Sequence, residues 1–252
     1  MIERASLNQV FHELLKPEQF KDYGPNGLQV EGRHEIRKIV SGVTASLALI
    51  EAAVAEKADA IVVHHGLFWR GQDGCVTGWM RQRLGALLAH NINLWAYHLP
   101  LDAHPELGNN AQLAHQLGLQ TEGNFGEQEL ACWGTALAPL TFTSPQELAA
   151  HIERVLGRAP VLVAPIQKPM KRIAWCTGGA QGYFEAAIAA GADAYITGEI
   201  SEPQAHYARE CGVAYLACGH HATERYGVQA VARHVAQQCG LQHVFIDIDN
   251  PA

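Results

Sequence analysis

Two segments of this 252-residue chain repeat one another, and this repeat constrains the possible folds more than any other feature of the sequence. Residues 51–65 (EAAVAEKADAIVVHH) and 185–199 (EAAIAAGADAYITGE) align without gaps at an offset of 134, with seven identities. In both segments, an alanine-rich helical pattern leads through Ala-Asp-Ala into an apolar run that is typical of a buried strand. An internal repeat is evidence about the whole architecture. We therefore predict two similar α/β lobes that arose by duplication.

Helix and strand patterns alternate along the rest of the chain. An apolar stripe from Leu7 to Leu15 predicts a first helix, with Ser6 as its N-cap and Pro17 as its end. The further strands are expected at 36–43, 60–63, 93–97, 172–176, 194–197, 213–217 and 243–248. The further helices are expected at 47–57, 80–90, 109–117, 145–156, 182–190, 202–211 and 223–238. This order predicts largely parallel sheets with helices on their faces.

A polar stretch near the middle of the chain separates the two halves of the pattern. Residues 120–129 are polar and contain two glycines, so we interpret them as a linker. The predicted lobes are therefore residues 1–125 and 126–252, with the C-terminal segment returning to contact the first lobe. Just after the linker, Ser-Pro-Gln-Glu at 144–147 has the pattern of a capping box and predicts a helix start.

The composition bounds the class of protein. Hydrophobic residues make up 48% of the chain, which favours a globular protein, and the net charge of -7 argues against a generally basic nucleic-acid-binding surface. We expect no signal peptide, no membrane-spanning helix and no association with a membrane. The six cysteines form no Cys-x-x-Cys pair. This pattern favours reduced thiols and a cytoplasmic protein.

Histidines gather at three places that each follow a predicted strand. The segments are 63–66 (VHHG), 98–104 (HLPLDAH) and 219–224 (GHHATE), and they hold six of the 14 histidines. Open α/β sheets place ligand sites at the carboxyl ends of their strands. The end of the repeat marks the same edge, with His64-His65 in one copy and Gly198-Glu199 in the other.

These residue types suit a metal site without cysteine. Imidazole and carboxylate ligands favour Zn, Mn, Fe or Ni over a structural thiolate zinc site. His64 and His65 share one site only where the strand ends, and they otherwise face two metals. His220 and Glu224 lie four residues apart at a helix start, with His221 as a competitor for that role. Asp102 follows a proline in a loop, and a carboxylate that bridges two ions would make a two-metal hydrolytic site.

Other conspicuous residues receive simpler interpretations. The acidic residues Glu51, Asp59 and Asp193 are assigned to helix and strand boundaries. Residues 177–182 (TGGAQG) follow a strand and precede a helix, so they are either an ordinary turn or a phosphate cradle. Four arginines near the motifs either meet phosphates or are solvated: Arg70, Arg81, Arg83 and Arg225.

The motifs together resemble those of a known family. They are 22–30 (DYGPNGLQV), 62–66 (VVHHG), 98–102 (HLPLD), 198–199 (GE) and 219–224 (GHHATE), and they reach from about residue 20 toward the C-terminus. The combination resembles the Nif-three-like family in its bacterial YbgI type, whose members are called GTP cyclohydrolase 1 type 2 homologues. The resemblance implies two similar, intertwined α/β lobes with a dinuclear metal site between them. It also implies a toroidal homohexamer whose metal sites face a central cavity.

The resemblance also implies roles for individual residues. One metal would be held by His65, Asp102 and Glu224. The second would be held by His64, His220 and Glu224, with Glu224 as the bridge. His98 would lie near the pair as a proton-transfer group or an additional ligand, and the resemblance favours His220 over His221.

The expected function is therefore that of a metal-dependent hydrolase. Its two divalent ions per subunit would activate water for attack on a nucleotide or another phosphorylated or cyclic-amide substrate. His98 or His104 would serve as the general acid or base. The alternative is a non-catalytic metal-binding ring, acting as a scaffold or regulator and binding nucleic acid in one variant. The net charge counts against that variant unless basic residues cluster in the cavity.

Overall fold

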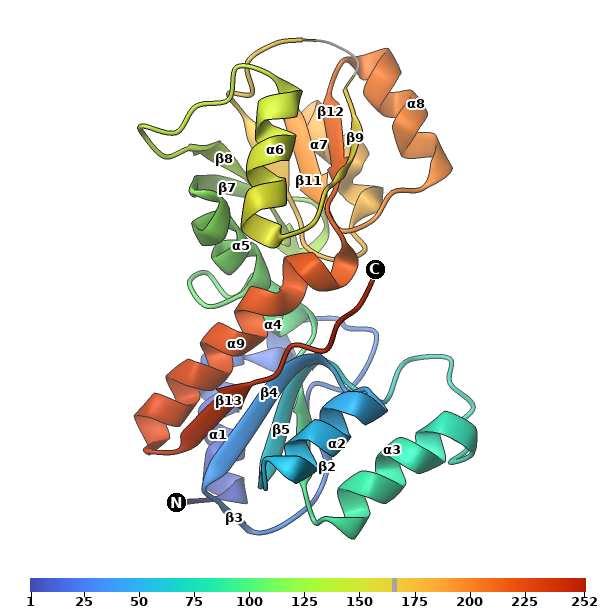
Figure 1. The fold of residues 1–252 in the computed structure, drawn as a ribbon, viewed down its shortest axis with the longest axis vertical. Helices are drawn as coiled ribbons and strands as arrows, with labels where there is room; N and C mark the ends of the chain where they lie inside the picture. Colours follow the sequence, from blue (N-terminus) through green and yellow to red (C-terminus); the bar gives the residue numbers. More distant parts are fainter. Residues whose placement is uncertain (165–166) are drawn as a thin grey trace. The chain divides into compact units, whose positions relative to one another are not determined.

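The computed structural model describes residues 1–164 and 167–252, and it has a mixed α/β fold that divides into two compact units (Figure 1). Unit 1 comprises Met1–Gly108 and Gly227–Asp249, and unit 2 comprises Asn109–Tyr226 and Asn250–Ala252. Each unit is therefore built from two stretches of chain. Among the described residues, no helix combines the length and the apolar character needed to cross a bilayer.

These bounds differ from the lobes expected at 1–125 and 126–252, and sheet pairing gives the reason. The segment expected as a linker contains a strand, β7 (Leu119–Phe125), which hydrogen-bonds to β8 (Ala131–Ala136) in the sheet of unit 2. The linker prediction is thus wrong. Near the other end of the chain, β13 (Gln242–Phe245) pairs with β4 (Lys38–Thr44) and so belongs to unit 1.

The main sheet of unit 1 has five strands in the order β13-β4-β5-β6-β2. The strands not yet given are β5 (Ala60–His65), β6 (Asn93–Ala96) and β2 (Gly27–Val30). The first four strands run parallel, and β2 closes the sheet as an antiparallel edge. A separate antiparallel ribbon joins β1 (Ile2–Glu3) to β3 (Glu35–Ile36).

Helices cover both faces of this sheet (Figure 1). On one face, α2 (Leu47–Ala55) and α3 (Gly78–Ala89) pack against the side chains of alternate strand residues. On the other face, α1 (Arg4–Leu15) packs together with the part of α9 (His220–Cys239) that lies in unit 1. Burial of these apolar side chains stabilises the unit by about 25 cal/mol per Å² of surface removed from water.

The sheet of unit 2 has six strands in the order β7-β8-β10-β11-β12-β9. The strands not yet given are β10 (Ile173–Trp175), β11 (Ala194–Thr197), β12 (Ala214–Ala217) and β9 (Val161–Val163). The three central strands β10, β11 and β12 are parallel to one another, and the outer pairings are antiparallel. The edge strand β9 lies beside β12 and precedes β10, β11 and β12 in the chain. In unit 1, β2 likewise lies beside β6 and precedes β4, β5 and β6.

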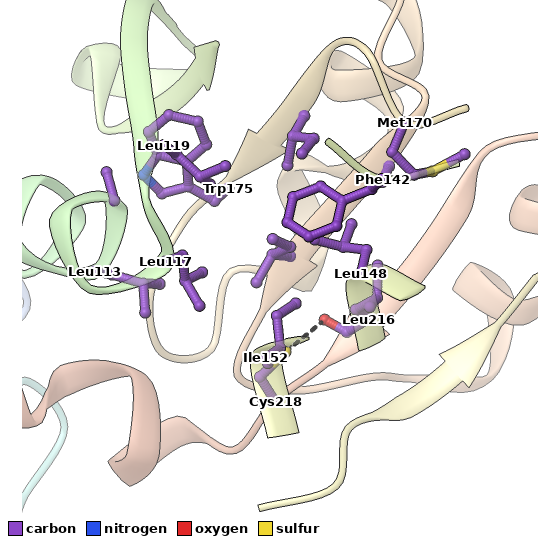
Figure 2. Close-up of a cluster of buried hydrophobic side chains, with 14 of the residues drawn as sticks. Leu113, Leu117, Leu119, Phe142, Leu148, Ile152, Met170, Trp175, Leu216 and Cys218 are labelled. Atoms are coloured by element: carbon purple, nitrogen blue, oxygen red, sulfur yellow. Dashed lines mark hydrogen bonds between the residues drawn. The ribbon is translucent and has the colours of Figure 1, made fainter. Parts of the chain in front are cut away.

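Two clusters of apolar side chains form the core of unit 2. On one face of the sheet, α5 (Asn109–Leu117) and α6 (Pro145–Leu156) pack against β10, β11 and β12. Figure 2 shows Phe142 and Leu148 in this cluster beside Leu216 of β12. On the other face, α7 (Phe184–Ala189) and α8 (Glu202–Cys211) cover Tyr195 and Tyr215.

The helix ends follow local chemistry, with some departures from the predictions. Ser144 accepts a hydrogen bond from the backbone N–H of Glu147 at 3.3 Å, as the capping box predicts. The N-cap of α1 is Glu3 rather than Ser6, since the ribbon strand β1 runs directly into the helix. The last long helix, α9, begins at His220 and not at residue 223.

Short helical segments complete the chain. They are the single-turn helices Pro17–Gln19, Glu127–Glu129 and Gln181–Tyr183, and the short helix α4 (Leu99–Ala103).

Candidate metal centre

In unit 1, a histidine cluster forms at the carboxyl end of the parallel strands. His64 and His65 are the last residues of β5, and His98 lies between β6 and α4. One ring nitrogen from each of these three histidines lies within 4.8 Å of the others. The carboxyl ends of neighbouring parallel strands share one edge, which explains why residues 33 positions apart meet.

The end of β5 lets two consecutive histidines approach the same place. The ring centroids of His64 and His65 are 4.5 Å apart, and those of His64 and His98 are 5.0 Å apart. Within a regular strand, consecutive side chains point to opposite faces. Here the strand stops before Gly66, where a Cβ atom would lie 2.6 Å from Cβ of Ala96. The chain therefore turns at a position that only glycine fits.

A carboxylate joins this cluster from α4. The Oδ1 atom of Asp102 lies 3.5 Å from Nε2 of His64, and both side chains are nearly or fully buried. The helix that carries Asp102 starts directly after His98, with Pro100 in its first turn. The short connection thus places His98 and Asp102 on the same edge of the sheet.

Asp22 is a functional candidate that lies in the 22–30 motif but that no local sequence pattern singled out. Its Oδ1 atom accepts a hydrogen bond from Nδ1 of His98 at 2.7 Å, and its Oδ2 atom accepts from the backbone N–H of Leu99 at 2.9 Å. The side chain of Asn26 donates to the same carboxylate at 2.8 Å. Burial by itself raises the pKa of Asp22, but the hydrogen bonds from His98 and Asn26 outweigh burial and lower the pKa to about 2.

In unit 2, α9 brings a second set of ligand atoms together. His220 and Glu224 lie one turn apart, with Nε2 of His220 3.2 Å from Oε2 of Glu224. On its other side, Nδ1 of His220 donates to Oε1 of Glu199 at 2.6 Å. Burial lowers the pKa of His220, but the hydrogen bonds and charges of Glu224 and Glu199 outweigh it and raise the pKa to about 9. With a raised pKa, the imidazole of His220 carries a proton on Nε2 as well as on Nδ1. A cation that binds at Nε2 would have to displace the Nε2 proton.

Two glycines let the backbone of unit 2 come close to these side chains. A Cβ atom on Gly178 would lie 2.0 Å from Oε1 of Glu224, and Gly178 has a φ of +69°. A Cβ atom on Gly198 would lie 2.6 Å from the carbonyl oxygen of Gly178 and from Cα of His220. The loop at residues 177–182 therefore lies against an acidic side chain, and this disfavours the phosphate cradle that the sequence left open.

Four histidines use the same ring nitrogen, Nδ1, for a contact with an oxygen of the protein. In each, Nδ1 is held by a neighbour: the Tyr97 carbonyl for His64, Thr44 Oγ1 for His65, Asp22 for His98 and Glu199 for His220. Carbonyl and carboxylate oxygens only accept, so Nδ1 of His64, His98 and His220 carries the proton that is donated. Metal-ligating histidines typically donate their second ring N–H in this way. The donor set therefore fits divalent metal ions bound through Nε2.

Other candidates from the sequence have structural roles. Nδ1 of His104 accepts from the backbone N–H groups of Glu106 and Leu107 at 3.2 and 3.0 Å, so this histidine caps its own turn. The carboxylate of Asp59 accepts from the backbone N–H groups of residues 37 and 38. That contact agrees with its assignment to a strand boundary.

Comparison with known proteins places the chain among bacterial relatives. Residues 2–251 match the family described as Duf34/NIF3 (NGG1p interacting factor 3). A protein of Neisseria meningitidis called "GTP cyclohydrolase 1 type 2 homolog" is 55% identical over 252 residues, which is 100% of both chains. A protein of the same name from Pseudomonas aeruginosa is 53% identical and covers 100% of this chain and 99% of its own length.

Solved structures agree in fold. The protein ybgI, described as of unknown function, matches with a TM-score of 0.95 at 47% identity, over 100% of both chains. A protein from Thermus thermophilus matches with a TM-score of 0.89 at 32% identity, again over 100% of both chains. Because the match to the family and the matches to these relatives span essentially the whole sequence, the chain belongs to the Duf34/NIF3 family.

Proposed function

We propose that this protein is a metal-dependent hydrolase that binds two divalent ions per subunit and acts on a nucleotide-like substrate. The orientation of the imidazoles carries the proposal. In unit 1 and in unit 2, Nδ1 of each candidate histidine ligand contacts an oxygen of the protein. On the other side of the ring, Nε2 of His64 lies 3.5 Å from Asp102 and Nε2 of His220 lies 3.2 Å from Glu224, so imidazole and carboxylate ligand atoms come together there. A histidine with a purely structural role has no need for this uniform arrangement.

The ligand assignment follows from the family resemblance. By this assignment, His65, Asp102 and Glu224 would hold one ion, and His64, His220 and Glu224 would hold the other. Glu224 would then serve both ions. This set of carboxylate and imidazole ligands suits Zn, Mn, Fe or Ni.

The chemistry divides between the ions and the protein. Bound divalent ions lower the pKa of a water ligand and polarise the group that is cleaved. His98 moves protons at Nε2, because Asp22 holds its Nδ1 proton at 2.7 Å. The low pKa of Asp22, about 2, keeps this carboxylate ionised and able to fix the imidazole. This is the arrangement of a general acid or base whose orientation is set by a third group.

The wider setting is also part of the proposal. The names of the relatives favour a guanine nucleotide as the first substrate to test. By resemblance to the family, we propose a cytoplasmic toroidal homohexamer with the metal centres facing its cavity. A small-molecule substrate suits the net charge of -7 better than nucleic acid does.

The test is hydrolysis by the purified full-length protein. The protein is loaded with Mn or Zn, its metal content is measured by mass spectrometry, and a panel of nucleotides including GTP is assayed for turnover. We expect turnover by wild type and its loss in His64→Ala, because His64 is fully buried in the cluster. His12→Ala is the matched control, since His12 is a half-exposed histidine that pairs with Glu18 at 3.3 Å.

Two outcomes would contradict the proposal. If the metal-loaded protein turns over no nucleotide, the non-catalytic metal-binding ring replaces the hydrolase as the better explanation. If His64→Ala keeps the metal content and turnover of wild type, the assigned centre is wrong.

A further inference from the structure

We propose that Tyr23, Trp69 and Arg70 form a subsite that binds a flat heterocycle carrying phosphate, immediately beside the histidine cluster of unit 1. The inference rests on the proposed function and adds to it the groups that would recognise a nucleotide. It involves two segments of unit 1, residues 22–24 and 66–70, neither of which supplies a proposed metal ligand.

The aromatic rings of the subsite contact His98 directly. The ring of Trp69 lies 5.1 Å from the ring of His98 at an interplanar angle of 89°, and the ring of Tyr23 lies 6.0 Å from it at 64°. Tyr23 is 54% exposed, which is unusual for a large ring next to a buried polar cluster. The exposed ring of Tyr23 and the half-buried ring of Trp69 thus offer π-surface beside the atoms that carry the proposed chemistry. Successive bases stack on such rings with little dependence on sequence.

A fixed positive charge completes the subsite. The Cζ atom of Arg70 lies 5.5 Å from the centroid of the Tyr23 ring, and its Nη2 atom donates to the backbone carbonyl of Asp22 at 2.8 Å. The ion pairs found among the described residues do not include Arg70. Its guanidinium is therefore held in place while most of its N–H donors remain available. Arginine forks of this kind bind phosphate through paired, charge-assisted hydrogen bonds.

The backbone fixes the two segments to one another. The N–H of Arg70 donates to the carbonyl of Tyr23 at 2.7 Å. A Cβ atom on Gly24 would lie 2.4 Å from the carbonyl oxygen of Phe68, so the segments approach as closely as only glycine permits. The indole N–H of Trp69 donates to the carbonyl of Gly66 at 3.2 Å. The indole therefore has its polar atom satisfied inside the protein and presents its ring as the contact surface.

The combination selects one class of ligand. A free phosphate ion would use Arg70 but not the two rings, and an uncharged aromatic molecule would use the rings but not the guanidinium. A nucleotide uses both, with its base on Tyr23 and Trp69 and its phosphate on Arg70. The distance from Trp69 to His98 then puts the substrate within reach of the proposed proton-transfer group.

The experiment measures equilibrium binding by calorimetry with three probes: GTP, guanosine and inorganic tripolyphosphate. The metal-loaded full-length protein is used, with Mn content checked for each variant. We expect Arg70→Gln to weaken GTP and tripolyphosphate by about tenfold or more and to leave guanosine nearly unchanged. We expect Tyr23→Ala to weaken GTP and guanosine by about tenfold, and Tyr23→Phe to restore most of that loss.

The matched control is Arg83→Gln. Arg83 also stacks on an exposed aromatic ring, with its Cζ atom 4.7 Å from the centroid of Trp79 in α3, but it makes no ring contact with the histidine cluster. Its substitution should change none of the three affinities. Equal effects of Arg70→Gln and Arg83→Gln would overturn the subsite, as would wild-type protein that binds none of the probes.

Failure of the subsite and failure of the proposed function give different results. If the metal-loaded protein hydrolyses bis-p-nitrophenyl phosphate but GTP binds Arg70→Gln and Tyr23→Ala as tightly as wild type, the subsite is wrong and the metal-dependent hydrolase remains. If the variants lose nucleotide affinity as expected but neither ester nor nucleotide is turned over, the subsite remains and the hydrolase is wrong.

Discussion

In unit 1, Asp59 accepts hydrogen bonds from the backbone N–H groups of residues 37 and 38, at 2.7 and 3.0 Å. In unit 2, 134 residues later, Asp193 accepts hydrogen bonds from the backbone N–H groups of residues 171 and 172, at 3.0 and 2.9 Å. Each aspartate also pairs with one cation through its other oxygen, at 2.8 Å in both cases. The same polar clamp therefore joins the first two parallel strands in each unit.

The strand registers repeat at the same offset. Ile39 pairs with Ala60 in unit 1, and Ile173 pairs with Ala194 in unit 2. The antiparallel edge strand stands in the same place in both sheets, as β2 beside β6 and as β9 beside β12. The other sides of the two sheets differ, because β13 pairs with β4 in parallel whereas β8 pairs with β10 in the antiparallel direction. The two units thus share three parallel strands and one antiparallel edge strand.

The difference that bears on function lies at the end of the second parallel strand. The repeat aligns His64-His65 of unit 1 with Gly198-Glu199 of unit 2. In unit 1 these positions supply two imidazoles. In unit 2, Gly198 has no side chain and lets the neighbouring backbone approach closely, and Glu199 accepts a hydrogen bond from His220. The same position of the repeat thus carries different chemistry in the two units.

The largest effect is expected when the shared clamp is broken. Asp59→Ala leaves two backbone N–H groups and a guanidinium without their acceptor, and the Asp59 side chain is only 10% exposed. At about 1–3 kcal/mol for each unsatisfied donor, the free energy of unfolding should fall by about 2–5 kcal/mol. The Asp193 side chain is 20% exposed, so Asp193→Ala should cost less because water can replace the carboxylate. Urea denaturation of the full-length variants measures both.

The control for this comparison is Glu51→Ala. Glu51 lies in α2 within the repeat, and it is exposed. If Asp59→Ala destabilises the protein no more than Glu51→Ala, the clamp contributes nothing and the likeness of the two units is only geometric.

A smaller loss is expected from Gly198→Ala. At the equivalent position unit 1 carries the large side chain of His64, but in unit 2 a Cβ atom would lie 2.6 Å from two backbone atoms. Backbone atoms cannot move aside as a flexible side chain does, so we expect the free energy of unfolding to fall by about 1–3 kcal/mol. Gly182→Ala is the control, since no atom lies within 4 Å of its added Cβ. Thermal melts in which both variants match wild type would show that the two strand ends tolerate the same side chains.

Sequence patterns were sufficient for the parallel strands of the two large sheets and insufficient for the antiparallel ones, β2, β7, β8 and β9. The strands β5 and β11 are buried along nearly their whole length, so their apolar runs are visible in the sequence. The edge strand β7 is mostly exposed and reads as a polar loop, because its strand character depends on pairing with β8. Non-local hydrogen bonds of this kind leave no local pattern.

The site shows the same limit. His64, His65, His98 and Asp102 were found because they follow strands, although their roles as ligands stay a prediction. The partners that orient the rings were missed, since Asp22 meets His98 across 76 positions and Glu199 meets His220 across 21. A signal for Glu199 was present, because the repeat aligns it with His65.

The orientation of His220 gives a sharper test of the diverged strand end. In Glu199→Gln the acceptor on Nδ1 of His220 becomes neutral, and oxygen and nitrogen of the amide compete for the contact. Losses of such partners typically lower metal affinity by 10–100-fold. Competition titration with a chelator should show this loss, while Glu202→Gln leaves the affinity unchanged. Glu202 also pairs with a histidine, His206, at 2.9 Å, but on the exposed surface of α8. Equal metal affinities of Glu199→Gln and wild type would make the 2.6 Å contact a surface ion pair without function.

The smallest expected effect concerns the residue that ends the repeated helix in each unit. Lys57 has a φ of +55° and the equivalent Gly191 has a φ of +74°, so both occupy the left-handed region. Lysine is strained there and glycine is not, although glycine loses more entropy on folding. Lys57→Gly should therefore stabilise unit 1 by a few tenths to about 1 kcal/mol, and Gly191→Ala should destabilise unit 2 by about 1 kcal/mol. Lys57→Ala separates the backbone from the side chain, because it removes the amine and keeps the Cβ atom. If urea denaturation gives Lys57→Ala the same gain as Lys57→Gly, the strain is absent and the two helix ends are not equivalent.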